Sequence, residues 1–430
     1  MRDHSSHIEL SREEAIRTLL DVCQFSPEHE IVPIEEAIGR VLAEDIHAQL
    51  DMPNCLTCMM DSVAVHWSDF EDGMPDTTKW IQGKDWEFAN TGVGMPEGFD
   101  TAITVEHVLL SDSDTKIAFD ALPSRQYAGT IPPGSKMKKG DLLVATGTVI
   151  TPLLAAHILS GNNTEVSVIK KPRVTFIPTG NELVNAPGRT DVLSGESPIP
   201  RGKNIETNSV MICSKIRAWG AEPLCHDILP DEPAAIEKAL KDTAACSDII
   251  VLNAGTSKGN DDWSIEVVER IGKVYYHQTT HGPGHHSWCA VVDDVPVIGI
   301  SGPPGGASFT TDFYVYPAVM KYLGQTERLP RLRVRLGSDL PAKQFKPKTA
   351  KPAGETRPVR DGEFYSVRLL KLSLADDGVL EAFPFECRHW PAPAEAETGA
   401  AYYLMRTGFD VESPKKGDWI EVELRPDYLP

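Results

Sequence analysis

The sequence predicts a multidomain protein in which a parallel α/β domain is combined with all-β regions. Between residues 172 and 327, short apolar runs such as DIIVLNAG alternate with helix-type runs such as EPAAIEKALKDTAACS. Strands that alternate with helices are typical of βαβ units and a parallel sheet. Residues 47–147 and 361–425 contain short β-type runs in place of this alternation. We therefore expect an inserted β domain before the α/β domain and a small β domain after it.

Helical patterns are expected in the remaining parts of the chain. Residues 9–23 form an amphipathic run in which Ser11 and Glu14 have the spacing of a capping box. We expect a second short helix after Pro33 and another helix at residues 151–160. The predicted domains are a helical or linker domain at residues 1–46 with 148–171, the inserted β domain at 47–147, the α/β domain at 172–327 and the C-terminal β domain at 328–430.

Composition and charge argue against several classes of protein. The 430-residue chain carries a net charge of −20, which disfavours a broad nucleic-acid-binding surface. It has no run of about 18 apolar residues, so we expect no membrane-spanning helix. The polar N-terminus lacks the apolar core of a signal peptide. Eight scattered cysteines are too few for a disulfide scaffold, so we expect reduced thiols and a cytoplasmic protein.

Three loops follow the apolar strands of the α/β domain: PTGNEL at residues 178–183, NAGTSKGNDDW at 253–263 and SGPPGGAS at 301–308. In open parallel sheets, ligands bind beyond the carboxyl ends of the strands. Because parallel strands end at the same edge, we expect the three loops to converge on one crevice. None of them matches the P-loop or the G-x-G-x-x-G fingerprint, so an ordinary kinase or dehydrogenase is disfavoured.

The residue types in these loops suit a phosphate and a divalent cation. Glycines allow close backbone approach to an anion, and helices that begin after the loops direct N–H groups toward it. The carboxylates of Glu182, Asp261 and Asp262 would suit a hard cation such as Mg²⁺. Any one loop alone is explained equally well as a tight strand-to-helix turn. The glycines are Gly255, Gly259, Gly302, Gly305 and Gly306.

Two further motifs carry weaker signals. Cys55 and Cys58 form an isolated C-x-x-C pair, and since a zinc site needs about four ligands, a metal or redox role is the minor alternative. The loop HGPGHH, residues 281–286, holds three histidines. Loop histidines are more often solvated than ligands, but this loop follows a β-type run in the α/β domain. Contact with an anionic ligand is therefore the alternative interpretation.

With these loops in place, the chain resembles the molybdopterin molybdenumtransferases, the MoeA family that includes the gephyrin E domain. The resemblance extends over nearly the whole length and rests on five stretches. They are DMPNCLTCMMDSVAV, NTGVGMPEGFDTAITVE, PTGNEL, NAGTSKGNDDW and GISGPPGGAS. The resemblance implies an elongated helical domain, a three-layer α/β domain of the molybdopterin-binding type and a β-barrel-like C-terminal domain.

The activity that the resemblance implies is insertion of molybdate into adenylylated molybdopterin, with release of AMP and assistance from Mg²⁺. The ligand would be a phosphorylated pterin. The resemblance also implies a homodimer whose site lies between the β insertion of one subunit and the α/β domain of the other. A molybdopterin adenylyltransferase and an apo-molybdoenzyme are the candidate partner proteins.

The resemblance also assigns roles to individual residues. Asp61 matches the acid of the family's MDGYA motif, Thr91 the threonine of TGA, and Glu182 the glutamate of TGDEL. The implied catalytic residues are Asp61, Thr91, Glu182 and Asp262. The implied ligand-binding residues are Thr179, Gly180, Asp231, Gly255, Ser257, Gly259, His281, His285, Gly302 and Pro304. The implied metal ligands are Glu182, Asp261 and Asp262.

The chain departs from the family pattern at several of these positions. Ser62 and Val63 follow the motif acid, the acidic segment near Thr130 has become YAGTIPPG, and HGPGHH stands where a PGKP loop flanked by lysines is expected. Exchanging lysine for histidine replaces a permanent cation with a group that is mostly neutral at pH 7. Two alternatives therefore stay open: a paralogue that binds molybdopterin as a carrier or scaffold, and an enzyme of this fold for another phosphorylated or metal-containing ligand.

Overall fold

The computed structural model describes residues 8–111, 116–187, 199–253, 263–340, 364–384, 399–407 and 412–426. The chain forms two compact units: the larger unit, Met1–Glu28 with Lys170–Pro430, and the smaller unit, His29–Ile169. None of the described helices is long and apolar enough to cross a membrane.

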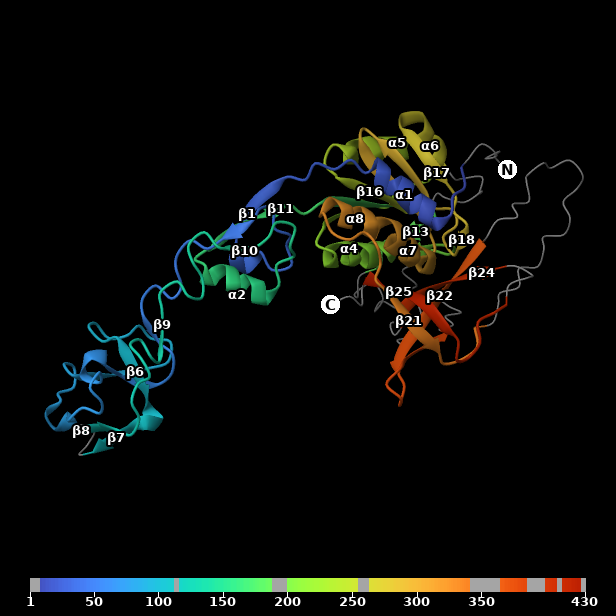
Figure 1. Ribbon diagram of the computed structural model, residues 1–430. Coiled ribbons are helices and arrows are strands. Elements are labelled where there is room, and N and C mark those ends of the chain that lie inside the picture. The colour runs from blue at the N-terminus through green and yellow to red at the C-terminus, as the bar shows by residue number, and fades with distance from the viewer. Residues whose placement is uncertain are drawn as a thin grey trace, which may run out of the picture. The chain divides into compact units, whose positions relative to one another are not determined.

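A six-stranded mixed sheet lies at the centre of the larger unit, in the order β15-β12-β16-β20-β19-β17 (Figure 1). The parallel strands are β15 (Glu222–Cys225), β12 (Arg173–Pro178), β16 (Ile249–Asn253) and β20 (Val295–Ile300). The antiparallel strands are β19 (Trp288–Val292) and β17 (Lys273–His277). The parallel part confirms the predicted α/β domain. The antiparallel edge was not predicted, because the Gly and Pro residues between its strands indicate only a loop.

Helices cover both faces of this sheet (Figure 1). On one face, Leu240 of α5 and Val268 of α6 share a core with Leu252 and Trp288 of the strands. On the other face, α4 contacts β12 and α7 contacts β20. This three-layer arrangement buries the apolar strands on both sides, as parallel sheets require. The helices are α1 (Arg12–Val22), α4 (Asn208–Ala218), α5 (Pro233–Ala244), α6 (Ser264–Ile271), α7 (Pro304–Thr310) and α8 (Tyr316–Tyr322).

Five strands of the C-terminal region close into a small barrel. β24 pairs with both β25 and β22, so the order β22-β23-β21-β25-β24 returns to its first strand. Val334, Leu370 and Val422 lie in its core. This closure confirms the predicted barrel-like domain. The strands are β21 (Arg331–Leu336), β22 (Phe364–Leu374), β23 (Leu380–Pro384), β24 (Gly399–Thr407) and β25 (Trp419–Leu424), and β18 (His281–Gly282) pairs with β22.

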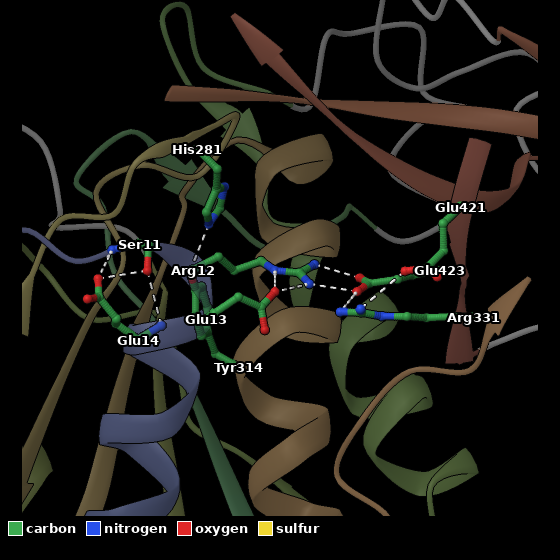
Figure 2. Close-up of polar contacts among 9 residues, drawn as sticks. All are labelled: Ser11, Arg12, Glu13, Glu14, His281, Tyr314, Arg331, Glu421 and Glu423. Atoms are coloured by element: carbon green, nitrogen blue, oxygen red, sulfur yellow. Dashed lines mark hydrogen bonds and ion pairs between the residues drawn. The ribbon is translucent and has the colours of Figure 1, made fainter. Parts of the chain in front are cut away.

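The first turn of α1 is fixed by the predicted capping box. The N–H of Glu14 donates to the Ser11 hydroxyl at 3.2 Å, and the N–H of Ser11 donates to the Glu14 carboxylate at 3.0 Å (Figure 2). These bonds satisfy N–H groups that have no partner within the helix. The apolar side of α1, which includes the fully buried Ala15 and Leu19, contacts α8 and β17.

A buried ion pair joins α1 to the barrel. The guanidinium of Arg12 donates to both carboxylate oxygens of Glu423 in β25, at 2.6 and 2.7 Å (Figure 2). The two side chains are only 7% and 11% exposed, and Arg331 donates to the same carboxylate at 3.1 Å. Burial acts to raise the pKa of Glu423, but the bonds and charges of Arg12 and Arg331 outweigh it and lower that pKa. The guanidinium also lies 4.6 Å from the centre of the Phe313 ring.

A π-helical turn, η5 (Thr311–Val315), separates α7 from α8. Pro317, near the start of α8, has no N–H to donate, which interrupts the regular helical ladder. Within this turn, the fully buried Asp312 accepts hydrogen bonds from Lys215 of α4 at 2.7 Å and from the Tyr402 hydroxyl of β24. The irregular turn therefore connects the α/β layers to the barrel.

One part of the smaller unit is less helical than predicted. The expected helix after Pro33 is only a 3-10 turn, η1 (Ile34–Glu36). Gly39 adopts a φ of +80°, and Val41 and Leu42 then form β-bridges, so the chain cannot continue as a helix. The helix predicted at residues 151–160 is present as α2 (Pro152–Ser160). The strands are β1 (His29–Pro33), which pairs with β11 (Glu165–Ile169), and β2 (Ile46–His47), which pairs with β10 (Leu142–Val144).

The rest of the smaller unit is β-rich, as predicted, and packs around Val63, Trp86, Ile103 and Phe119. Its sheets are β5-β4-β6, β3-β9 and β7-β8. The strands are β3 (Thr57–Cys58), β4 (Ser62–Val65), β5 (Trp86–Ala89), β6 (Thr101–Thr104), β7 (Val108–Ser111), β8 (Lys116–Phe119) and β9 (Thr130–Ile131). Short 3-10 turns connect them: η2 (Trp67–Asp69), η3 (Thr77–Lys79) and η4 (Val105–His107).

Replacing Arg12 by methionine is expected to destabilise the larger unit by about 3 kcal/mol, because it leaves the Glu423 carboxylate buried without its bidentate partner. Urea unfolding at pH 7 measures this loss. The pKa of Glu423 is lowered in the folded protein, so its stabilising contribution is present at neutral pH and is lost as the pH falls below the ordinary carboxyl range near 4. In Arg12→Met, the free energy of unfolding should therefore decrease less steeply than in wild type as the pH is lowered through the ordinary carboxyl range.

Two control variants accompany this measurement. The double variant Arg12→Met with Glu423→Gln should lose less stability than Arg12→Met alone, because no unpaired charge remains. Lys238→Met removes an exposed pair with Asp242 and should cost less than about 0.5 kcal/mol. Equal losses in Arg12→Met and Lys238→Met would contradict the assigned role of the ion pair.

Candidate functional site at the carboxyl edge of the sheet

The three strand-end loops begin at one edge of the sheet. Pro178 of β12 lies opposite Asn253 of β16, and Asn253 lies opposite Ile300 of β20. Because these strands are parallel, the residues that follow them leave the sheet at the same edge, as the sequence predicted. Residues 179–182, 253 and 301–304 form the strand-end site.

Two buried asparagines hold these loops together. Asn253 donates from its side-chain nitrogen to the carbonyl oxygen of Ser301 at 2.6 Å. Asn208, the first residue of α4, donates from Nδ2 to Oδ1 of Asn253 and to the carbonyl oxygen of Gly302, each at 2.8 Å. The two asparagines are 2% and 6% exposed, so these bonds are shielded from water. Neither was predicted as a site residue. Asn253 could have been noticed in the sequence because it is a polar residue that directly follows the apolar run DIIVL.

Thr179 and Gly180 shape the first loop. Thr179 is fully buried, and its hydroxyl donates to the carbonyl oxygen of Asn253 at 3.1 Å, so it ties two loops together from inside. Gly180 has a φ of +149°, and a Cβ at this position would lie 2.6 Å from the carboxylate of Glu182. Any side chain here would displace that carboxylate. Glu182 itself is exposed.

Asn181 connects the first loop to two neighbouring segments. Its N–H donates to the Asp231 carboxylate at 2.9 Å, and the N–H of Asp231 donates to the Asn181 side-chain oxygen at 3.2 Å. On the other side, the ammonium of Lys203 donates to the carbonyl oxygen of Asn181. The short parallel strands β13 (Leu183–Val184) and β14 (Asn204–Ile205) align these two segments. Asp231, which was predicted to bind the ligand, therefore also fixes the loop.

The remaining residues predicted for this site fall into two groups. Gly302 and Pro304 are half-buried in the third loop, and Pro304 begins α7. The second group lies outside the described residues: Gly255, Ser257, Gly259, Asp261 and Asp262. Within the part of the chain that the structure describes, no cluster of three or more His, Cys, Asp or Glu side chains is placed to hold a metal ion.

His281 is not placed to contact an anion, which corrects the sequence prediction. Its ring is fully buried, with Nδ1 3.1 Å from the carbonyl oxygen of Pro283 and Nε2 2.7 Å from the Tyr314 hydroxyl. Because a carbonyl can only accept, Nδ1 carries the hydrogen and Nε2 accepts from the tyrosine. Burial, reinforced by the charge of Arg12, lowers the pKa of His281 to about 3. The ring is therefore neutral at pH 7. His285 is exposed beside His286, with ring centres 3.7 Å apart, and its role stays a prediction.

Asp61 and Thr91 form a pair in the smaller unit. The Thr91 N–H and hydroxyl both donate to one oxygen of the Asp61 carboxylate, at 2.8 and 2.9 Å. These bonds, the backbone one first, lower the pKa of Asp61, so the exposed carboxylate is ionised at neutral pH. The structure thus brings together the two residues that the resemblance assigned as catalytic in this unit.

The unusual residues near this pair serve the β structure. Ser62 and Val63, which depart from the family motif, are buried in β4, and Thr130 forms part of β9 in place of a carboxylate loop. Cys58 is fully buried, and its thiol donates to the carbonyl oxygen of Met60 at 2.9 Å, whereas Cys55 is exposed. The two thiols therefore lie in different environments, one buried in the β structure and one at the surface.

A cavity of about 260 Å³ lies away from the strand-end site, beside α1 and the barrel. Arg12 and Glu423 line it, and none of the residues predicted for the site does so. Its other charged lining residues carry both signs: Glu13, Arg17, Asp21, Asp312, Glu327, Arg328 and Arg331. It therefore does not provide a charged surface of one sign for an anionic ligand.

Comparison with known families agrees with this architecture. Residues 10–160 match the family described as MoeA N-terminal region (domain I and II), and residues 175–321 match the family described as probable molybdopterin binding domain. Together the two matches span more than half of the chain. Its class is therefore that of proteins built around a molybdopterin-binding-type α/β domain.

Individual relatives narrow this class. A molybdopterin molybdenumtransferase of Haemophilus influenzae is 27% identical over 333 residues, 74% of this chain and 79% of the relative. That of Bacillus subtilis is 26% identical over 332 residues, 72% and 74% of the two chains. A molybdopterin biosynthesis MoeA protein of Pyrococcus horikoshii has the same fold, with a TM-score of 0.72, 22% identity and coverage of 97% and 99%. The chain belongs to the MoeA family of molybdopterin molybdenumtransferases.

Replacing Asn208 by aspartate is expected to loosen the strand-end site by about 2 kcal/mol or more without changing side-chain size. Carboxylate oxygens would then face Oδ1 of Asn253 and the carbonyl oxygen of Gly302, both of which need donors. Urea unfolding at pH 7 measures the effect. The matched control is Asn204→Ala, because Asn204 is exposed and lies four residues earlier. Wild-type stability in Asn208→Asp would show that the asparagine does not hold these loops.

Proposed function

We propose that this protein inserts molybdate into adenylylated molybdopterin and releases AMP, as a molybdopterin molybdenumtransferase of the molybdenum cofactor pathway. The strand-end site is the observation that supports this proposal most directly. At the carboxyl edge of a parallel sheet, Asn208 and Asn253 join the start of the second loop to the third loop, and sheets of this type bind their ligands at that edge. Relatives that match over about 70% of the chain are named molybdopterin molybdenumtransferases, which supports transfer of molybdenum to molybdopterin as the reaction.

In this proposal the loops bind the phosphorylated pterin. Gly180 and Gly302 let the backbone approach the ligand closely, and Asp231 holds the first loop in position. The chemistry to be promoted is cleavage of the adenylyl phosphate bond and placement of an oxyanion beside the two sulfurs of the pterin. Fixed donors around a phosphate favour such a reaction because they need no rearrangement as charge develops.

We propose Mg²⁺ as the metal that assists cleavage. Mg²⁺ is commonly held by one or two carboxylates together with substrate phosphates, and the exposed Glu182 carboxylate beside Gly180 fits that requirement. Asp261 and Asp262, which lie outside the described residues, are the other proposed ligands. When bound, the ion would stabilise negative charge on the phosphate that is cleaved.

We propose a homodimer in which Asp61 and Thr91 act on the ligand held by the strand-end site of the other subunit. Three apolar side chains close in sequence to this pair are half exposed, which suits a surface that a second copy covers. Their exposed fractions are 50% for Met59, 49% for Met60 and 54% for Val93. The cysteines of the described residues are free thiols, which supports a reducing cytoplasm. An adenylyltransferase would supply the substrate, and an apo-molybdoenzyme would receive the product.

AMP release tests the proposed activity. Purified protein is mixed with adenylylated molybdopterin, Mg²⁺ and molybdate, and AMP is quantified chromatographically. We expect release that depends on molybdate and follows protein concentration. Tight pterin binding without AMP release would instead identify a carrier, an alternative that the neutral His281 and the β9 strand at Thr130 would then explain. Binding of neither pterin form would exclude both functions.

Mixing two inactive variants tests the shared site. Asp61→Asn and Glu182→Gln are each expected to lower AMP release by about 100-fold, since each removes a charge from the proposed reaction centre. A mixed dimer contains one subunit of each variant. If the two residues act across subunits, one of its two sites then combines the intact Asp61 of one subunit with the intact Glu182 of the other. Recovery of activity after denaturation and joint refolding measures the formation of such sites. Two copies of Asp61→Asn refolded together are the control. Unrestored activity in verified mixed dimers would contradict a site shared in this way.

A further inference from the structure

The strand-end site carries negative charge where an anionic ligand has to bind. Glu182 and Asp231 lie in or beside the first loop, and the whole chain has a net charge of −20. His281 offers no compensation, because it is buried and neutral with both ring nitrogens bonded. A cation of the protein at this edge would therefore favour binding of a phosphate, because like charges at close range repel.

Lys203 is a cation that the fold holds at this edge. The N–H of Asn204 donates to the carbonyl oxygen of Glu182 at 2.8 Å, and the N–H of Glu206 donates to that of Val184 at 2.9 Å. These two bonds hold the segment carrying Lys203 beside the first loop. The ammonium itself donates to the carbonyl oxygen of Asn181, three residues beyond the end of β12. Backbone pairing and side-chain contact thus place this charge at the carboxyl end of a central strand.

The ammonium of Lys203 keeps capacity for a ligand. An ammonium has three N–H donors, and the described structure uses one of them, on Asn181. Among the described residues, no carboxylate lies within ion-pair distance of Lys203, although Glu182 belongs to the adjoining loop. The side chain is exposed, so two donors and a full charge are accessible at the loop that Gly180 opens to close approach.

We propose that Lys203 binds the phosphate of the pterin ligand and brings a positive charge of the protein to the strand-end site, beside the acidic Glu182 and Asp231. This inference rests on the proposed function, because it assumes a phosphorylated ligand at this edge. The anchor on Asn181 restricts the side chain before the ligand arrives, which reduces the entropy lost on binding. Asn208 lies five residues further along the same segment and bonds Asn253, at the start of the second loop, and Gly302 of the third loop. One short stretch therefore carries both the cation and the asparagine that organises the site.

Binding of adenylylated molybdopterin to the full chain, without molybdate, tests this role. Lys203→Met should weaken binding by about 10- to 100-fold, the range for losing a charge-assisted hydrogen bond, and should reduce the dependence of affinity on salt. Lys203→Arg should stay within about threefold of wild type, because it retains the charge. Lys238→Met, a change to an exposed lysine on α5, should bind like wild type.

Lys203→Gln separates ligand binding from a purely structural role. Glutamine can still donate to the Asn181 carbonyl but carries no charge, so it should weaken binding nearly as much as methionine does. Wild-type affinity in either the glutamine or the methionine variant would overturn the inference. A loss seen only when molybdate is added would also overturn it, because the lysine would then serve the other oxyanion.

The wild-type measurement distinguishes this inference from the proposed function. If wild-type protein binds the pterin and releases AMP while Lys203→Met binds equally well, the inference fails and the function stands. If the wild type neither binds nor releases AMP, the proposed function fails and the inference fails with it. Thermal unfolding of each variant, compared with wild type, shows whether a loss of binding comes from a loss of folded protein.

Discussion

The larger unit depends on one irregular turn of helix. Pro317 cannot donate a backbone hydrogen bond, and the five residues of η5 widen the helix before it continues as α8. Three consecutive side chains of this turn then face three different segments. Asp312 accepts from α4 and from the barrel, Phe313 lies under the guanidinium of α1, and Tyr314 bonds the ring of His281. These three contacts bring α4, the barrel, α1 and the His281 loop together at one turn of helix.

The strand-end site, like the π-helical turn, is held in place by a few buried polar side chains. α4 is held near its middle by Lys215 on Asp312, and at its start by Asn208 on the second and third loops. The helix is thus bonded both to the π-helical turn and to the strand-end site, and that turn is bonded to the barrel through Tyr402. Buried polar networks of this kind are costly when incomplete and specific when satisfied. They hold Asn253, at the start of the second loop, and the described residues of the third loop in position before any ligand is present.

Local sequence patterns were sufficient to predict much of the fold. Contacts between segments that are far apart in the sequence could not be predicted in this way. The capping box of α1, the alternation of strands and helices and the convergence of the strand-end loops all follow from short-range rules. The prediction of a helix after Pro33 was wrong. The local pattern favours a helix, but Val41 and Leu42 form β-bridges with distant residues instead. The assignment of His281 failed because burial is a property of the packed structure. Lys203 was not predicted for the same reason, since its neighbour Asn181 lies 22 residues away.

The Arg12–Glu423 pair has a consequence for how the protein is made. Its two partners are separated by 411 residues. A ribosome adding about 5–20 residues per second needs roughly 20–80 s between them. For most of that interval the amphipathic α1 has neither its barrel partner nor the π-helical turn that contacts its arginine. The smaller unit, which is synthesised directly after α1, can complete its own core in the meantime. The contact between α1 and the barrel can therefore form only when translation is nearly complete.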